Sequence, residues 1–267
     1  MKPTHTFQTE QIVAGYDDKT ILHGIDVVIP SNRINVIIGA NACGKSTLLK
    51  TMARLIKPES GNITLDGKSI AKFPPKQLAR VLGILPQSPI VPEGISVTDL
   101  VGRGRFPHQS LLQTWSKKDY DAVAEAMEIM DITELADRNI DELSGGQRQR
   151  VWIAMALTQQ TDILFLDEPT TFLDITYQVE ILDLLTDLNR KRGTTIVMVL
   201  HDINLSARYA DHIFALREGE LIAEGPPSEV ITTALVKDIF DLECTVVKDP
   251  VSLSPMVIPK GRYHVHN

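Results

Sequence analysis

The hydrophobic positions of this chain follow two different periods. Nearly continuous apolar runs of strand length occur at residues 34–38, 163–166 and 196–200. Residues 177–192, between the last two runs, read as an amphipathic helix whose apolar positions are Val179, Leu182, Leu185 and Leu188. A strand, a helix and a strand of these lengths predict two parallel strands joined by a crossover helix. The pattern therefore favours an α/β fold.

The first part of the chain reads as β-rich. Residues 11–14 and 25–29 alternate or cluster like strands, and the run at 34–38 stops at Gly39. A helix is expected to follow from about Lys45, with one apolar face made of Leu48, Leu49, Met52 and Leu55.

The middle third, residues 88–160, changes to helical spacing. Ser116 and Asp119 have the spacing of a variant capping box, which predicts a helix start. The apolar positions that follow are Val123, Ala126, Met127 and Met130. Their spacing favours ordinary core packing over a ligand site for the methionines. We expect a single domain over residues 1–267, with a helical subdomain inserted at about 88–160.

The last fifty residues give weaker signals. The Glu218-Gly219-Glu220 stretch predicts a hairpin turn, and one helix is expected from about Ser228 to Asp241. The proline-interrupted segment after this helix predicts no defined element.

Composition narrows the class of protein. The 267 residues are 43 % hydrophobic and carry a formal net charge of −7, which suits a globular domain and disfavours nucleic acid as a partner. Cys43 and Cys244 do not form a metal-type pair, and so few thiols suit a reducing compartment. No apolar run has the length of a signal-peptide core or of a membrane span, so we expect a soluble, cytosolic chain.

Residues 39–46 carry a phosphate-binding motif. They fit G-x-x-x-x-G-K-[ST] at each fixed position, between a predicted strand and a predicted helix. Backbone N–H groups of such a loop point at a phosphate, and the helix N-terminus adds a partial positive charge. Lys45 can then reach the β- and γ-phosphates, and the Ser46 hydroxyl can bind Mg²⁺. Cys43 is interpreted as a small space-filling residue of the loop rather than a redox group.

Polar residues also follow three strand-like runs. Asp167 and Glu168 end the run at 163–166, where Asp167 can hold Mg²⁺ and Glu168 can orient or deprotonate a water. His201 follows the run at 196–200 and can contact a γ-phosphate, because strand C-termini of a parallel sheet face the nucleotide. Gln87 follows the run that ends at Leu85, and its amide can bind Mg²⁺ or the water. Each residue alone could be an ordinary surface residue.

With the glycine turn Leu143-Ser144-Gly145-Gly146-Gln147, this ordered set resembles the nucleotide-binding subunits of ABC transporters. The resemblance covers nearly the whole chain. It implies a P-loop NTPase core, with a mostly parallel sheet between helices and an antiparallel β part at the N-terminus. It also implies ATP and Mg²⁺ as ligands. The ATP-binding residues would be Tyr16 beneath the adenine and the loop residues Gly39, Ala40, Asn41, Ala42, Cys43, Gly44, Lys45, Ser46 and Thr47.

The resemblance further implies that two copies of the chain bind two ATP molecules head to tail. Each nucleotide would also be contacted by the other copy's signature residues, Ser144, Gly145, Gly146 and Gln147, with Ser144 capping the helix that begins near Gly145. Leu173 and Asp174 would lie in the dimer-contact loop. Glu168, His201 and Gln87 would be catalytic, and Ser46, Gln87 and Asp167 would bind Mg²⁺.

Two positions depart from the family pattern. Many members have glycine where this chain has Ala42, and we expect alanine to be tolerated if its φ is negative. The stretch Thr170-Thr171-Phe172 replaces smaller residues of many relatives, which leaves the detail of the dimer-contact loop open.

Within the family, the chain resembles the ATPases of iron-chelate and cobalamin importers, those for ferric enterobactin-like siderophores included, through residues 97–108, 169–175 and 216–222 with the turn at 225–227. This implies two membrane permease subunits, an extracytoplasmic substrate-binding protein and a peripheral position on the cytoplasmic face of the inner membrane. Residues 87–108 would dock the permease, or else form a solvated face with one buried anchor. The cargo could instead be cobalamin, haem or another metal chelate. Two further alternatives are a soluble ABC ATPase that acts on nucleic acid or the ribosome, and a protein that senses ATP without hydrolysing it. The presence of Glu168 and His201 disfavours the ATP sensor.

Overall fold

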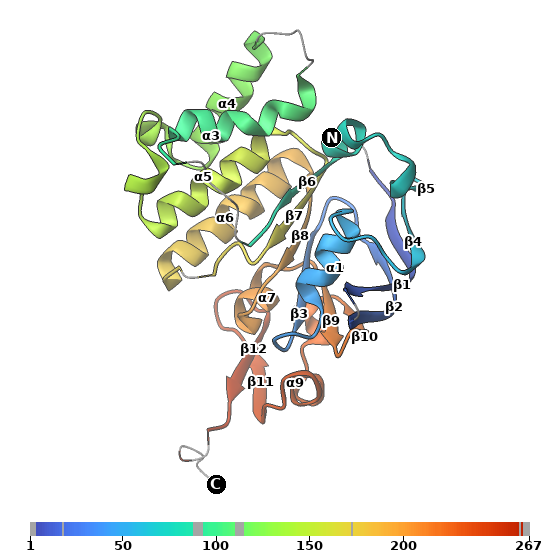
Figure 1. The fold of residues 1–267 in the computed structure, drawn as a ribbon. Coiled ribbons are helices and arrows are strands. Elements are labelled where there is room, and N and C mark those ends of the chain that lie inside the picture. The colour runs from blue at the N-terminus through green and yellow to red at the C-terminus, as the bar shows by residue number, and fades with distance from the viewer. Residues whose placement is uncertain are drawn as a thin grey trace. The chain divides into compact units, whose positions relative to one another are not determined.

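A computed structural model describes residues 4–17, 19–87, 93–109, 115–171, 173–261 and 263 of the chain. These residues form two compact units, which are drawn in Figure 1. We call Lys72–Thr194 the middle unit, and we call the remaining N-terminal and C-terminal residues the N/C unit. Each unit is treated separately below.

The N/C unit begins with a four-stranded antiparallel sheet in the order β2-β1-β4-β5. Its strands are β1 (Phe7–Tyr16), β2 (Lys19–Ile29), β4 (Ser60–Leu65) and β5 (Lys68–Ser69). Phe7 pairs with Ile29 on one side and with Leu65 on the other, and all three side chains are buried. The expected N-terminal antiparallel part is therefore confirmed.

A second group of strands in the N/C unit is mainly parallel. Strand β3 (Ile34–Gly39) lies between β8 (Thr195–Val199) and β9 (His212–Arg217) and runs parallel to both. All six residues of β3 are buried, which explains the nearly continuous apolar run in its sequence. Strand β10 (Glu220–Gly225) pairs antiparallel with β9 through the predicted turn, where Glu218 and Gly219 have φ values of 49° and 80°.

The helices of the N/C unit correct two expectations. Helix α1 (Lys45–Met52) ends before Leu55, which is 59 % exposed and does not belong to the buried face. The single helix expected near 228–241 is two helices, α8 (Pro227–Val230) and α9 (Thr233–Phe240). The break occurs because the Thr232 side chain accepts a hydrogen bond from the Leu235 N–H and so starts a new helix.

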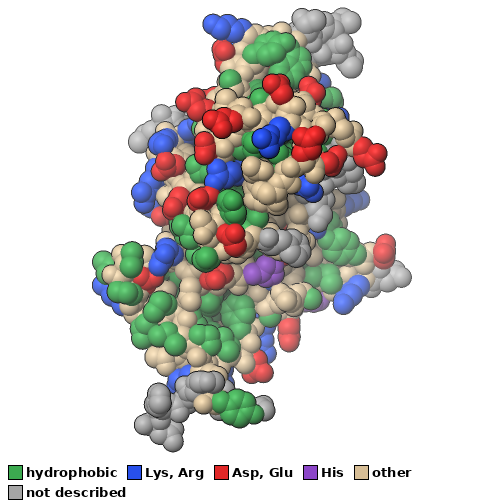
Figure 2. Space-filling model, turned by 90° about the vertical axis from the view of Figure 1, so that its left-hand side faces the viewer, with side chains coloured by type: hydrophobic (Ala, Val, Ile, Leu, Met, Phe, Trp, Pro, Cys, Tyr) green, Lys and Arg blue, Asp and Glu red, His purple; other side chains and the backbone are tan. Residues whose placement is uncertain are grey.

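The C-terminal segment forms a hairpin that the sequence did not predict. Strands β11 (Cys244–Lys248) and β12 (Pro255–Pro259) pair antiparallel. Asn204 of α7 (Ile203–Tyr209) holds β12, since its side chain accepts from the Val257 N–H at 2.7 Å and donates to the Val257 carbonyl at 3.2 Å. Figure 2 shows hydrophobic side chains gathered on the lower part of the face drawn, at the height where Figure 1 places this hairpin.

The middle unit combines a parallel strand pair with a group of helices (Figure 1). Strand β6 (Leu82–Leu85) runs parallel to β7 (Ile163–Asp167). The α-helices are α2 (Pro75–Val81), α3 (Val97–Gly102), α4 (Lys117–Ile129), α5 (Gly145–Thr158) and α6 (Ile175–Arg192). Short 3-10 turns are η1 (Ile70–Lys72), at the border of the two units, and η2 (Arg103–His108), η3 (Thr133–Leu135) and η4 (Ile140–Glu142).

Helix α4 confirms the sequence prediction for the middle unit. It starts at the predicted capping box, where the Asp119 carboxylate accepts from the Ser116 N–H at 2.9 Å. Met127 and Met130 are buried among core residues, as expected. Residues 88–92 and 110–114 of the predicted insert lie outside the described residues, and the limits of the insert stay a prediction. No helix in the described part of the chain is long and apolar enough to span a membrane.

Candidate functional site

The phosphate loop connects β3 to α1 in the N/C unit. Gly44 caps α1 with φ 107°, and a Cβ added there would lie 2.9 Å from a methyl carbon of Leu22, so glycine is required. Lys45 is 5 % exposed, and its Nζ donates to the carbonyls of Gly39 and Ala40, at 2.9 Å each. The ammonium group is thus held within the loop.

Ala42 does not meet the condition under which alanine was expected to be tolerated. Its φ is 62°, in the left-handed region, whereas the condition was a negative φ. A left-handed conformation costs an alanine roughly 1–2 kcal/mol relative to the right-handed one. The loop therefore imposes strain at the position where many family members have glycine.

Cys43 fits the space-filling interpretation. The residue is 6 % exposed, and burial raises the pKa of its thiol, an effect that the Lys45 charge opposes in part. A buried, neutral thiol is a poor nucleophile. The Cys43 carbonyl accepts from the Gly219 N–H at 2.9 Å, so the β9–β10 turn supports the loop from outside the motif.

Two further predicted residues of the N/C unit lie at strand ends. His201 follows β8 and is exposed, directly before the α7 cap residue Asp202. Because Ile37 pairs with Val199 in parallel strands, His201 and the start of the phosphate loop at Gly39 lie at the same edge of the sheet. Tyr16 ends β1 and is 48 % exposed, which leaves its ring accessible.

In the middle unit, the structure brings Gln87 and Glu168 together. Strands β6 and β7 are parallel, with Leu85 opposite Leu166, so both residues follow strand ends at one edge. The Gln87 side-chain amide donates to Glu168 Oε2 at 2.5 Å. Thr171 donates its hydroxyl to the same oxygen at 2.9 Å. We call Gln87, Glu168 and Thr171 the carboxylate cluster.

The backbone of the carboxylate cluster is also unusual. Glu168 has φ 54°, which is strained for a residue with a side chain, and such strain concentrates at functional sites. The preceding Asp167 is 2 % exposed at the end of β7. Sequence reasoning missed Thr171, which it treated only as a departure from the family. The signal was its position three residues after Glu168, which suits a side-chain contact across a turn.

The signature residues form the predicted helix start. Ser144 caps α5, because its hydroxyl accepts from the Gln147 N–H at 3.3 Å. The Gln147 side-chain oxygen in turn accepts a hydrogen bond from the Ser144 N–H at 3.1 Å, which completes a capping box. A Cβ added to Gly145 would meet no atom within 4 Å, so the start of the helix faces open space.

The predicted dimer-contact loop, Leu173 and Asp174, is linked to the predicted signature residues through Tyr177. Asp174 caps α6 by accepting from the Tyr177 N–H at 3.1 Å, and the Leu173 carbonyl accepts from Gln178 at 2.8 Å. This places the Tyr177 ring against Gly146, where an added Cβ would lie 3.1 Å from ring carbons. Further along the same helices, Arg150 of α5 forms an ion pair with Glu180 of α6.

The starts of α5 and α6 are thus held side by side, an arrangement that sequence spacing did not reveal. Phe172, within the dimer-contact loop, lies outside the described residues.

A phosphate loop opening a helix, with a carboxylate pair that ends a parallel strand, defines a P-loop nucleotide-binding protein. The family model "ABC transporter" matches residues 22–171, which is more than half of the chain. The chain therefore belongs to the ABC transporter family, as an ATP-binding subunit with ATPase activity coupled to transport.

Relatives in this family match over nearly their full length. The achromobactin transport ATP-binding protein CbrD of Dickeya dadantii is 50 % identical, over 95 % of this chain and 94 % of its own. The ferric enterobactin transport ATP-binding protein FepC of Escherichia coli is 49 % identical, over 95 % of this chain and 93 % of its own. The dimeric structure of MJ0796, a bacterial ABC transporter cassette, has a TM-score of 0.73 at 26 % identity and covers 82 % of this chain and 98 % of its own.

Proposed function

We propose that this chain is the ATP-hydrolysing motor subunit of an importer for ferric siderophores. The observation that carries the proposal is the identity of about half of the residues, over 95 % of the chain, with ATP-binding proteins of achromobactin and ferric enterobactin transport. The phosphate loop and the carboxylate cluster supply the chemistry that such a motor requires.

Nucleotide binding is assigned to the N/C unit. Residues 39–47 receive the phosphates of ATP with their backbone N–H groups, and Lys45 exchanges its carbonyl contacts for phosphate oxygens. The exposed ring of Tyr16 stacks on the adenine.

Magnesium fits the oxygen donors that this chain offers. Ser46 supplies a hydroxyl, Gln87 an amide oxygen and Asp167 a buried carboxylate, which are the ligand types that Mg²⁺ prefers. Mg²⁺ held by these donors would neutralise charge on the β- and γ-phosphates.

Hydrolysis is assigned to Glu168. Its carboxylate accepts a proton from the attacking water, or orients that water, while Gln87 and Thr171 fix the position of Oε2. His201 contacts the γ-phosphate from the end of β8.

A complete site requires a second copy of the chain. Ser144, Gly145, Gly146 and Gln147 contact the γ-phosphate bound by the other copy, because the open start of α5 presents N–H groups to an anion. Leu173 and Asp174 meet the partner in the dimer-contact loop. The dimeric structure of the MJ0796 cassette supports this stoichiometry. Two permease subunits dock on residues 87–108 at the cytoplasmic face of the inner membrane and receive cargo from a binding protein.

The cargo is tested by growth of a strain that lacks this chain, on single iron chelates as iron source. We expect loss of growth on a ferric siderophore, rescue by the wild-type chain and no rescue by Lys45→Ala, which removes phosphate charge compensation. Normal growth on all siderophores, with impaired uptake of cobalamin or haem, would assign another cargo to the same motor.

A further inference from the structure

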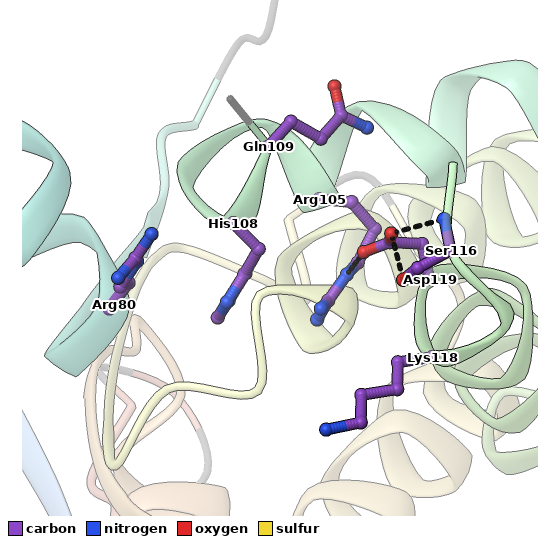
Figure 3. A pocket seen from close by; sticks show the side chains of 7 residues that line it. All are labelled: Arg80, Arg105, His108, Gln109, Ser116, Lys118 and Asp119. Carbon is purple, nitrogen blue, oxygen red and sulfur yellow. Dashed lines mark hydrogen bonds and ion pairs between the residues drawn. The ribbon is translucent and has the colours of Figure 1, made fainter. Parts of the chain in front are cut away.

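A basic pocket lies in the middle unit and has no role in the proposed ATPase mechanism. It has a volume of about 310 Å³, close to the lower size of small-molecule sites. Its lining comes from α2, from the 3-10 turn Arg103–His108 and from the start of α4, as Figure 3 shows. The lining residues are Arg80, Arg105, His108, Gln109, Ser116, Lys118 and Asp119.

Arg105 forms a fixed, buried part of this pocket. Its side chain is 6 % exposed, and Nε donates to Asp119 at 2.9 Å. Nη1 donates to the Thr158 carbonyl at 2.7 Å and to the Gln160 side chain at 3.1 Å. Nη2 makes no hydrogen bond with any residue that the structure describes. The guanidinium group is therefore held rigidly with donor capacity left over.

The Asp119 carboxylate cannot neutralise the other cations. Oδ1 accepts from Arg105, and Oδ2 accepts from the Ser116 N–H at 2.9 Å and from its hydroxyl at 2.6 Å. These hydrogen bonds, those from Ser116 first, lower the pKa of Asp119 to about 2, so the group is ionised and already satisfied. Among the described lining residues it is the one carboxylate.

Arg80 and Lys118 lie on opposite sides of the pocket and add two positive charges that the Asp119 carboxylate does not neutralise (Figure 3). Arg80 donates Nε to the Pro107 carbonyl at 3.0 Å, which leaves both Nη atoms for a ligand. The Lys118 ammonium forms no ion pair within the described part of the chain. His108 donates Nε2 to the Gln159 carbonyl, and burial with nearby Arg105 lowers its pKa, so it is neutral near pH 7. Three cations thus face one carboxylate.

We propose that this pocket binds a phosphate group. Hydrogen-bond donors approach the pocket from three separate elements. A tetrahedral oxyanion has several acceptor oxygens and can use all of these donors, whereas a planar carboxylate is satisfied by one guanidinium group. The buried Arg105 preorganises the site, and the more exposed Arg80 and Lys118 close around the ligand. The phosphate comes either from a free solute or from the headgroup of an anionic lipid.

The first experiment titrates pyrophosphate into the full chain saturated with ADP and Mg²⁺, so that the phosphate loop is occupied. Isothermal titration calorimetry compares the wild-type chain, the double variant Arg80→Ala/Lys118→Ala and the control Lys117→Ala. Lys117 is exposed on the same helix and does not line the pocket. We expect the double variant to bind at least about tenfold more weakly and the control to match the wild type. Arg105 is not replaced, because its removal would leave Asp119 buried without its partner.

Equal binding by all three proteins, or no binding by the wild type at millimolar pyrophosphate, would overturn the proposal. Citrate that competes as strongly as pyrophosphate would overturn it in favour of a carboxylate ligand. ATPase activity at saturating ATP should be unchanged in the double variant, so a failure of this site is distinguishable from a failure of the proposed motor function.

The second experiment separates the two sources of phosphate. The same proteins are sedimented with vesicles of phosphatidylglycerol or of phosphatidylcholine. Binding to the anionic vesicles that is lost in the double variant and kept in Lys117→Ala assigns the pocket to a lipid headgroup. Pyrophosphate binding without vesicle binding assigns it to a free solute.

Discussion

The phosphate loop of the N/C unit is held by its backbone, whereas the carboxylate cluster of the middle unit is held by side chains. In the loop, the left-handed Gly44, the Lys45 contacts with loop carbonyls and the Gly219–Cys43 hydrogen bond fix the path of the chain. In the cluster, side chains more than 80 residues apart meet, since Gln87 and Glu168 are separated by 81 positions. Apart from the hydrogen bond from Gly219, the first arrangement depends on residues close together in the sequence, whereas the second depends on tertiary packing.

The largest expected effect concerns the cluster. Replacing Glu168 by Gln removes the proposed base but keeps the size and most contacts of the side chain, so hydrolysis should fall by about 10²–10⁴-fold. ATP should still bind through the loop and trap a dimer, which size-exclusion chromatography with ATP and Mg²⁺ detects. Glu134→Gln, at an exposed carboxylate of the same unit, is the control and should hydrolyse ATP normally. A Glu168→Gln chain that stays monomeric and hydrolyses ATP at the wild-type rate would refute the role of Glu168.

The next effect tests whether the contact between α5 and α6 matters for pairing. Tyr177→Ala removes the ring that packs on Gly146, and the loss of this partly buried apolar contact costs on the order of 1 kcal/mol. We expect ATP-dependent dimerisation in the Glu168→Gln background to weaken by roughly five- to tenfold, while Tyr177→Phe keeps the parent affinity. Analytical ultracentrifugation measures the dimer, and nucleotide binding by the monomer should not change. Equal dimer affinity for the Ala and Phe variants would mean that the ring does not position the signature.

The same contrast explains what the sequence could predict. The phosphate loop, the Ser144 cap and the Ser116 capping box depend on residues within a few positions of one another, and apart from the left-handed Ala42 they have the expected local structure. The three strand-length apolar runs were also predicted correctly as strands, since β3, β7 and β8 form there and buried parallel strands give nearly continuous apolar runs.

The errors arise where distant or subtle interactions decide the structure. Tyr177 acts through a tertiary contact with Gly146 that spacing alone does not report, whereas Thr171 contacts Glu168 three residues away, a local contact that the sequence reasoning overlooked. The β11–β12 hairpin is fixed by Asn204, which lies more than fifty residues upstream of its partner Val257. Leu55 fits the helical spacing of the apolar residues, but α1 ends before it, so its side chain does not lie on the buried face of that helix.

A smaller effect should appear in acid, because side-chain contacts of the middle unit titrate and backbone contacts do not. The pKa of Asp119 is about 2 in the folded chain and about 3.9 for an unperturbed carboxyl, so its contribution to stability is complete above pH 4 and is lost as the pH falls towards 2. Asp119→Asn should remove this part of the pH dependence, on the order of 1 kcal/mol after solvent screening.

Urea unfolding followed by tryptophan fluorescence measures this difference, since both tryptophans, Trp115 and Trp152, lie in the middle unit. The stability gap between the wild type and Asp119→Asn should narrow as the pH falls from 5 to 2. A gap that stays constant over this range would show that the Asp119 contacts add no pH-dependent stability.

The smallest effect returns to the loop and tests its backbone strain. Ala42→Gly should relieve the cost of the left-handed φ of 62°, although glycine gains freedom in the unfolded chain, so a net stabilisation of about 0.5–1 kcal/mol is expected. This corresponds to a rise of roughly 1–4 °C in the unfolding midpoint by calorimetry. The matched variant Ala40→Gly, at a loop alanine outside the positive-φ residues, should lower the midpoint or leave it unchanged. If Ala42→Gly lowers the midpoint as well, the loop stores no strain at this position, and its shape depends on packing as much as the carboxylate cluster does.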